Sequence, residues 1–198
     1  MSYWSHQKSA QRARAVDVAQ VGEVAAELLD EGGPNALTVR AVAQRLDVAA
    51  ASLYSRLSSS DDLFDLALDH ALGSDADLQA ATRDATLDEL MLAYFRHLVR
   101  HPWACQVIAL RAPRGPNYLQ LSERICVLFI ELGSSDPLGD AYAVSNFVIG
   151  SATTASVAGH EHEAAVDARQ APEYAALHGA YHGDPEVVLV AGLKALLS

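Results

Sequence analysis

The chain has 198 residues, of which 51% are hydrophobic and 7% aromatic, and Ala and Leu supply much of the hydrophobic share. Because Ala and Leu lose little freedom in a helix, whereas sheets favour β-branched and aromatic residues, the composition predicts an all-α fold. The net charge of −11 argues at first against a nucleic-acid partner. The charge is unevenly divided, however: residues 1–60 carry six basic and six acidic side chains, so residues 61–198 supply the whole acidic excess.

The sequence carries no signal for a membrane or an oxidising compartment. No stretch approaches the roughly 20 apolar residues of a membrane span. The polar start, Met1–Lys8, lacks the apolar segment of a signal peptide. Two cysteines, Cys105 and Cys126, are too few for a disulfide framework or a thiolate metal cage. We therefore expect a cytoplasmic protein that binds no membrane.

A helix is predicted over about Ser9–Asp30. Its apolar residues recur at spacings of three and four, which places them on one face. The helix is expected to stop at Gly32-Gly33-Pro34, because glycine accepts a positive φ and proline cannot continue a helix.

Two short helices with a tight turn between them are predicted next. Thr38 is expected to cap the first, in which apolar residues from Val39 to Leu46 repeat at i, i+3, i+4 and i+7. Asp47-Val48 forms the turn, and the second short helix spans about Ala49–Ser55. Such a pair after a longer helix is typical of a helix-turn-helix, whose last helix lies in the DNA major groove. The same pattern also fits any small helical hairpin.

The remainder is predicted to be helical as well. A fourth helix spans about Asp61–Leu72, and the polar stretch Gly73–Ala85 is expected to be a linker. Further helices are predicted at Thr86–Arg100, Pro102–Arg111, Tyr118–Leu132, Leu138–His160 and Pro185–Leu197, with at most a short helix near Pro172–Leu177. We expect a DNA-binding domain over residues 1–60 and a second helical domain over residues 61–198.

The stretch Leu37–Leu46, followed by Val48, Leu53 and Tyr54, closely resembles the N-terminal domain of the tetracycline-repressor (TetR) family. The similarity runs from about Arg12 to Leu72 and includes the Glu31-Gly32-Gly33 break. The second part resembles the ligand-binding half of that family more loosely, through His101-Pro102-Trp103 and the apolar run Val187–Leu193.

The resemblance implies which residues contact DNA. Thr38, Tyr54 and the amides that open the fourth helix would hold phosphates. Arg40 is our first choice as a base reader, because arginine suits bidentate contact with guanine. Arg40 as a solvated charge, Tyr54 as a packing residue and Arg56 in a surface ion pair remain open. The expected DNA-contacting residues are Thr38, Arg40, Ala50, Ala51, Ser52, Tyr54, Ser55, Arg56 and Ser60.

Three departures from the family pattern predict weak, salt-sensitive binding. Asp47 stands where the turn usually has glycine, and Ser60 replaces the usual lysine before the fourth helix. The recognition helix begins with three alanines, which cannot donate hydrogen bonds to bases. Phosphate contacts dominate affinity for DNA. An N-terminal arm with Lys8, Arg12 and Arg14 either adds such contacts or is a disordered tail.

The second domain is expected to enclose a pocket for a small, largely apolar effector. For any single one of the aromatic residues that fit such a lining, a place in an ordinary hydrophobic core is the favoured interpretation, because ligand pockets are also largely apolar. The family resemblance favours the pocket. Its expected lining residues are Tyr94, Phe95, Trp103, Tyr118, Phe129 and Phe147.

Neither a metal site nor an active-site motif stands out. His160 and His162 flank Glu161, and His178 and His182 have the spacing of helical zinc ligands. Nearby glycines weaken a helix at the second pair, so solvated histidines are the preferred interpretation. GxSxG, phosphate-loop and dinucleotide fingerprints are absent from the sequence. We expect no metal and no cofactor.

Two functional hypotheses follow. The first is a homodimeric, ligand-responsive repressor that binds a palindromic double-stranded DNA operator and dimerises through helices near 138–160 and 185–197. Small residues in the first of these helices allow close helix contact, and two-fold symmetry matches a palindrome. The second is a helical small-molecule-binding or metal-dependent enzyme with a merely structural helix-turn-helix. We prefer the first and expect no enzymatic activity.

Overall fold

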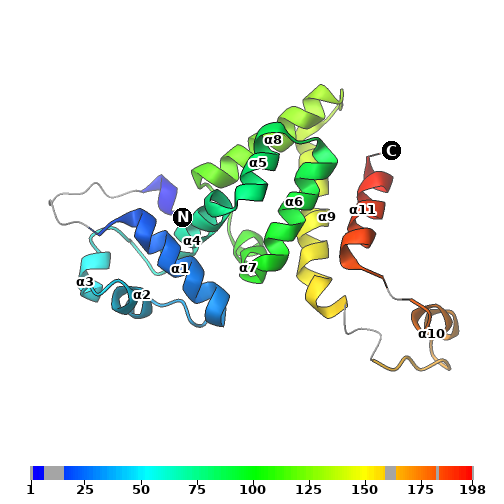
Figure 1. Ribbon diagram of the computed structural model, residues 1–198, viewed down its shortest axis with the longest axis horizontal. Coiled ribbons are helices and arrows are strands. Elements are labelled where there is room, and N and C mark those ends of the chain that lie inside the picture. Colours follow the sequence, from blue (N-terminus) through cyan, green and yellow to red (C-terminus); the bar gives the residue numbers. More distant parts are fainter. Residues whose placement is uncertain (1, 7–15, 159–163, 182, 198) are drawn as a thin grey trace.

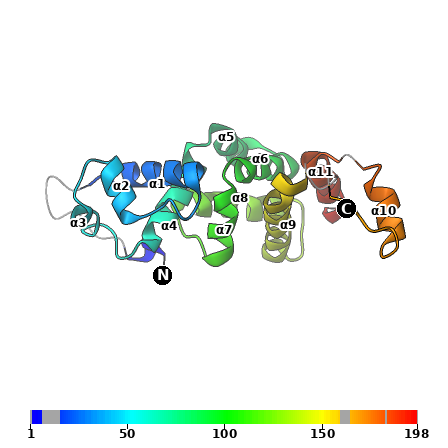
Figure 2. The ribbon, with the colours of Figure 1, turned by 90° about the horizontal axis from the view of Figure 1, so that it is seen from below.

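The chain folds as a row of packed helices in the computed structural model (Figure 1). The structure describes residues 2–6, 16–158, 164–181 and 183–197, and within these ranges it contains no β-strand. The predicted all-α fold is confirmed. The molecule is elongated, with the predicted helix-turn-helix at one end and residues 164–181 at the other (Figure 2).

Helix α1 (Val18–Gly32) starts later than its apolar pattern predicted. Asp17 is in extended conformation and caps the helix by accepting a 2.9 Å hydrogen bond from Ala19 N. The part of the predicted helix over residues 9–15 lies outside the described residues. The expected stop is confirmed, because Gly33 has a φ of +66°.

Helices α2 (Val39–Arg45) and α3 (Ala50–Leu53) form the predicted pair. Thr38 caps α2 as expected, with its hydroxyl oxygen 3.0 Å from Ala41 N. Asp47 in the turn has a φ of +52°, the left-handed conformation that glycine adopts most easily. Helix α3 is shorter than predicted, because a turn replaces the helix after Leu53.

Helix α4 (Asp61–Ser74) packs along α1. The two backbones approach so closely that a Cβ on Gly22 would stand 3.0 Å from the carbonyl oxygen of Leu66. Through α4 the three N-terminal helices join the rest of the molecule, since α4 also contacts the helices that follow.

The prediction of a linker over Gly73–Ala85 is wrong. Helix α5 (Ala76–Asp84) begins directly after α4, and Asp75 caps it by accepting a hydrogen bond from Leu78 N. The polar composition misled the prediction because Leu78 and Thr82 are the only residues that α5 buries fully. The acidic residues that suggested a linker occupy the cap and the exposed face.

The remaining helices agree with the prediction to within about two residues at each end. Thr86 and Glu89 form a reciprocal capping box at the start of α6. Helices α6, α9 and α11 lie side by side, with α5, α7 and α8 around them (Figure 1). Helix α10 buries none of its residues. The bounds are α6 Leu87–Arg100, α7 Pro102–Leu110, α8 Pro116–Glu131, α9 Pro137–Ala158, α10 Pro172–His178 and α11 Pro185–Leu196.

Candidate nucleic-acid interface and effector domain

The predicted DNA-contacting residues gather on α2, α3 and the turn that follows, at one end of the molecule (Figure 1). A small apolar cluster fixes this unit: Val42 and Leu53 are fully buried and Leu57 is 1% exposed. A four-residue helix such as α3 is unstable alone, so its orientation depends on this packing. The outer face is thereby left to polar and small side chains.

Arg40 and Arg45 lie on the same short helix but have different surroundings. Arg45 forms ion pairs with Glu27 and Glu31 of α1, and this contact holds the pKa of the Glu31 carboxyl below its ordinary value. Arg40 is exposed and has no ion-pair partner among the described residues. Arg45 therefore joins α2 to α1, whereas the guanidinium of Arg40 is available to a ligand.

The predicted residues of α2 and α3 present few polar groups. Thr38, Ala51 and Ser52 are exposed, and Ala50 is half-buried. The Thr38 hydroxyl oxygen already accepts the bond from Ala41 N, so its own hydrogen is what it can offer a phosphate.

The turn after α3 carries the rest of the predicted set. Tyr54 is 53% exposed, Ser55 Oγ donates to the carbonyl of Ser52, and Ser60 is exposed just before α4. Arg56 is half-buried, and its Nε donates a 3.3 Å hydrogen bond to the carbonyl oxygen of Val16. Part of the Arg56 guanidinium therefore stabilises the fold by binding the backbone just before α1. Lys8, Arg12 and Arg14 of the predicted arm lie outside the described residues.

Sequence reasoning missed three buried carboxylates on one face of α4. Asp62, Asp65 and Asp69 are 0%, 5% and 7% exposed. Their successive spacings of three and four residues place them on one face, among the buried leucines of that helix, and this spacing was the signal that the sequence offered.

Each of the three carboxylates bonds to a different part of the chain. Asp62 accepts a 2.6 Å bond from Ser58 N, and Asp65 a 2.7 Å bond from Tyr3 N. Asp69 accepts bonds from the backbone and side-chain nitrogens of Asn117 at the start of α8. Burial raises the pKa of Asp69, and the bonds from Asn117 oppose this shift. The face of α4 therefore links the region after α3 to the start of α8.

The six aromatic residues predicted to line a pocket all belong to one hydrophobic core or pack against it. Tyr94 is fully buried in α6; burial raises its pKa well above the ordinary value, and nearby Tyr118 and Cys105 add to the shift. Phe147 of α9 packs against Gly192 of α11 so closely that a Cβ there would collide with its ring. Buried positions in the core are also occupied by Phe95 and Phe129.

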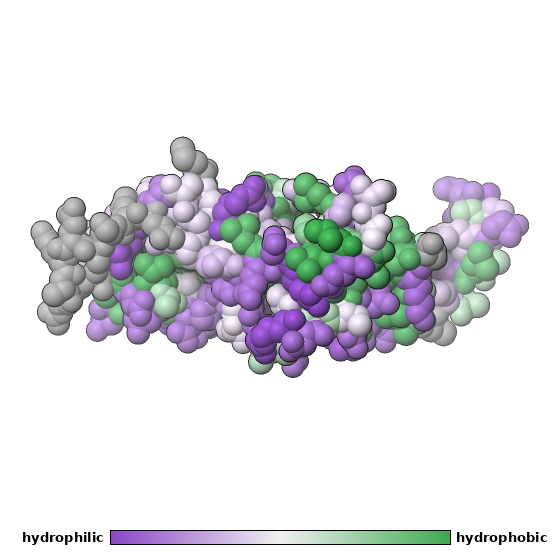
Figure 3. Space-filling view, turned by 90° about the horizontal axis from the view of Figure 1, so that it is seen from above, coloured by the Kyte–Doolittle hydropathy of each residue, from purple (hydrophilic) through white to green (hydrophobic). Residues whose placement is uncertain are grey.

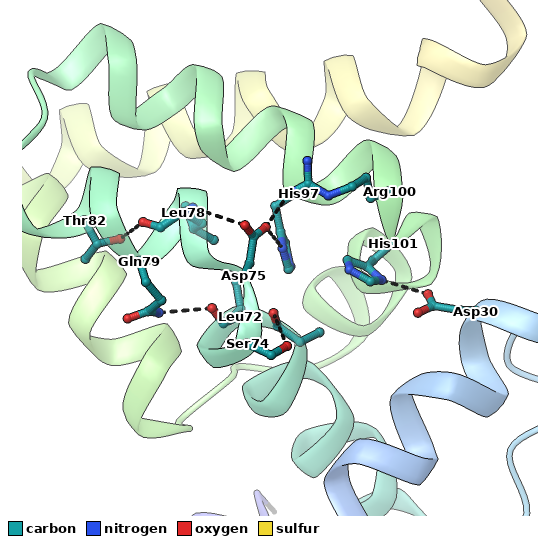
Figure 4. A network of polar contacts seen from close by, with 11 residues as sticks. Asp30, Leu72, Ser74, Asp75, Leu78, Gln79, Thr82, His97, Arg100 and His101 are labelled. Atoms are coloured by element: carbon teal, nitrogen blue, oxygen red, sulfur yellow. Dashed lines mark hydrogen bonds and ion pairs between the residues drawn. The ribbon is translucent and has the colours of Figure 1, made fainter.

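Trp103 lies at the boundary with the DNA-binding unit. It is 3% exposed, and its indole Nε1–H donates a 2.6 Å hydrogen bond to Asp30 at the end of α1. His101 Nδ1 lies 2.8 Å from the same oxygen, Asp30 Oδ1 (Figure 4). Close by, Nδ1 of the buried His97 donates to Asp75 at the junction of α4 and α5. Trp103 thus touches α1 as well as the core.

Neither a shared metal ligand set nor a membrane helix is present in the part of the chain that the structure describes. No three His, Cys, Asp or Glu side chains of that part converge on one point. His160, His162 and His182 lie outside it. None of its helices has both the length and the apolar character to cross a bilayer.

Sequence comparison places both halves of the chain in one family. The profile of bacterial regulatory proteins of the tetR family matches residues 23–67, and that of the tetracyclin repressor-like C-terminal domain matches residues 76–186. An HTH-type transcriptional regulator of Saccharopolyspora erythraea is 36% identical over 178 residues, which cover 83% of this chain and 75% of that protein.

Solved structures share the fold across both domains. A protein of Streptomyces coelicolor A3(2), described as a possible TetR family transcriptional regulator, is 28% identical, with a TM-score of 0.77 over 91% of this chain and 97% of its own. The S. coelicolor protein ActR, solved with actinorhodin, is 23% identical, with a TM-score of 0.71 over 92% of this chain and 95% of its own. Together with the two profiles, these matches establish that the chain belongs to the TetR family of ligand-responsive, DNA-binding transcriptional regulators.

Proposed function

We propose that this protein is a cytoplasmic homodimeric repressor, without enzymatic activity, that binds a palindromic operator and leaves it when a small molecule enters the second domain. The observation that carries the proposal is the outer face of α2 and α3, where Arg40 is exposed and unpaired among the described residues. We assign DNA binding to residues 1–60 and effector binding and dimerisation to residues 61–198.

Arg40 is the proposed base reader, because its guanidinium can donate two parallel hydrogen bonds to a guanine. Thr38, Tyr54, Ser55 and Ser60 are proposed to hold phosphates. Ala50, Ala51 and Ser52 of α3 would allow close approach to base edges, with alanine reading at most a thymine methyl. For Arg56 we propose a phosphate contact in addition to its bond to Val16.

Dimerisation through α9 and α11 is supported by apolar side chains that the isolated chain leaves in water. Tyr142 and Val157 of α9 are 64% and 63% exposed, and Val187 and Leu196 of α11 are 66% and 52% exposed. Hydrophobic surface over the second domain is visible in Figure 3. Large exposed apolar patches are typical of interaction surfaces, and a two-fold dimer would place two recognition helices on successive major-groove faces.

The proposed effector is a small, largely apolar molecule with an aromatic part. It would enter among the six aromatic residues of the second domain, near the buried phenol of Tyr94 and the half-buried phenol of Tyr118. Burial raises the pKa of both phenols, so they stay neutral and can donate hydrogen bonds. Tyr118 also lines a narrow gap with Trp4 and Arg114. That ActR, which shares the fold, was solved with actinorhodin supports the proposal that a small molecule binds.

Operator binding is tested with a labelled duplex that covers the DNA upstream of the gene, titrated at low and moderate salt. Arg40→Ala should weaken binding by about 1–3 kcal/mol, a factor of about 5 to 150. Arg45→Ala is the matched control, since it removes a charge from the same helix but one that is paired with Glu31. Its effect should be small.

The same titration separates the regulator from its alternative. If the protein were an enzyme with a structural helix-turn-helix, Arg40→Ala would leave its function unchanged. If the wild-type protein fails to bind any upstream DNA at low salt, the proposed function is wrong.

A further inference from the structure

The first residues of the chain are part of the packed structure of the DNA-binding unit. We call Ser2–His6 the N-terminal latch. It contains the short 3-10 helix η1 (Tyr3–Ser5), which packs on α4 (Figures 1 and 2). Tyr3 is 3% exposed, and its ring meets the ring of Trp4 edge to face at 5.2 Å between centroids.

Two buried carboxylates of α4 hold the latch in place. Tyr3 N donates to Asp65, and His6 Nε2 lies 3.1 Å from Asp62 Oδ1. Asp62 is fully buried. The loss of a hydrogen-bond partner from a buried acceptor destabilises the folded state. The bond from His6 therefore stabilises the buried carboxylate of Asp62.

Asp62 also holds the segment that follows the recognition helix. Its Oδ2 accepts a 2.6 Å bond from Ser58 N and a longer one from Ser59 N. These two residues follow the buried Leu57 and lie just beyond α3. One carboxylate therefore joins the latch to the polypeptide that orients α3.

We propose that the N-terminal latch positions the recognition helix for operator binding, with His6 and Asp62 as the positioning residues. Neither residue needs to touch DNA. The inference rests on the operator binding proposed above, and it couples that binding to the docking of the latch on α4. Because coupling between two equilibria is reciprocal, the operator should favour the docked latch by the same factor by which docking favours operator binding.

Fluorine NMR of the full-length protein labelled with 5-fluorotryptophan can follow the latch directly. The chain has two tryptophans, so Trp4 reports the latch and Trp103 serves as an internal reference; Trp4→Phe assigns the two signals. The solvent isotope shift in deuterium oxide measures the exposure of each indole. Operator affinity is measured on the same samples with the upstream duplex.

His6→Ala should expose Trp4 and weaken operator binding by about 5- to 20-fold, the effect of one lost bond to a buried acceptor. Adding operator to this variant should bury Trp4 again, while the Trp103 signal stays in place. Tyr3→Ala, which removes the buried ring and keeps both carboxylates, should act in the same direction. His178→Ala is the matched control, because it removes a histidine from α10, far from the latch (Figure 1).

The proposal is overturned if Trp4 becomes exposed in His6→Ala while operator affinity stays within about twofold of wild type. It is also overturned if saturating operator leaves the exposure of Trp4 in that variant unchanged. Both results presuppose that the wild-type protein binds operator. Failure of the wild type to bind is a separate result that overturns the proposed function together with the latch.

Discussion

Trp103 in α7 donates its indole hydrogen to Asp30 in α1 over 2.6 Å, although the two residues are 73 positions apart in the chain. The bond crosses from the second domain to the DNA-binding unit. His101 Nδ1 approaches the same carboxylate oxygen (Figure 4). Two side chains around the start of α7 therefore share one acceptor. Any movement of α7 relative to α1 must therefore break this hydrogen bond or move its two partners together.

Asp30→Ala should lower the free energy of unfolding by about 1–3 kcal/mol, because the indole N–H of Trp103 would lose its partner in a buried site. Asp30→Asn keeps an acceptor oxygen and should lose less. Urea unfolding followed by circular dichroism measures both. Asp84→Ala, at the exposed end of α5, is the control. Equal stability of Asp30→Ala and wild type would show that the bond does not contribute.

The buried imidazole of His97 predicts a loss of stability in acid. Burial lowers the pKa of His97 to about 4, and the bond to Asp75 opposes this shift only in part. In the unfolded chain a histidine has a pKa of about 6.5. Between those values the unfolded state binds a proton that the native state does not, so the free energy of unfolding falls as pH falls.

Because of this lower pKa in the native state, the free energy of unfolding should fall by roughly 3 kcal/mol between pH 6.5 and pH 4. Urea unfolding at pH 4.5, 5.5, 6.5 and 7.5 measures the slope. His97→Gln should flatten it, whereas His178→Gln on α10 should leave it unchanged. An unchanged slope in His97→Gln would mean that other groups cause the acid sensitivity.

Local periodicity and capping predicted most of the fold. The apolar spacing of α2 and the Thr38 cap depend on residues a few positions apart, and both predictions are confirmed. Helix α5 was missed because a helix that buries only two side chains has the composition of a linker. Helix α5 is stabilised by packing on α6, and the composition of the segment alone does not reveal this contact.

The contacts around the candidate interface were less predictable, because they join residues far apart in the chain. Asp65 meets Tyr3 across 62 positions, and Asp69 meets Asn117 across 48. From the sequence, no buried partner is predicted for the acidic residues of α4. Their burial follows from the docking of η1 and α8, which no local pattern encodes.

The turn between α2 and α3 offers a test of backbone strain. Asp47 has a φ of +52°, which suits Gly, Asn and Asp but not β-branched residues. Asp47→Val should destabilise the protein by about 1–2 kcal/mol. Asp47→Gly should be at least as stable as wild type. Thermal unfolding ranks the variants, and a stable Asp47→Val would contradict the strained turn.

The same position tests the charge near DNA. Asp47→Asn removes an exposed negative charge and keeps a side chain that accepts this backbone conformation, so stability should change little. Operator affinity should rise, and more at low salt, because phosphate repulsion is screened by salt. The upstream duplex titrated at two salt concentrations measures this. Weaker binding by Asp47→Asn would show that Asp47 contributes a favourable contact.

Charge placed on α11 tests the proposed dimer. Val187 is 66% exposed in the isolated chain, so Val187→Glu should leave the fold intact. A carboxylate at an apolar interface is costly to bury, and the variant should therefore be monomeric by analytical ultracentrifugation. Its operator affinity should fall, since a monomer contacts one half-site. Leu110→Glu on α7, also highly exposed, is the control and should remain dimeric. A dimeric Val187→Glu would exclude this face of α11 from the interface.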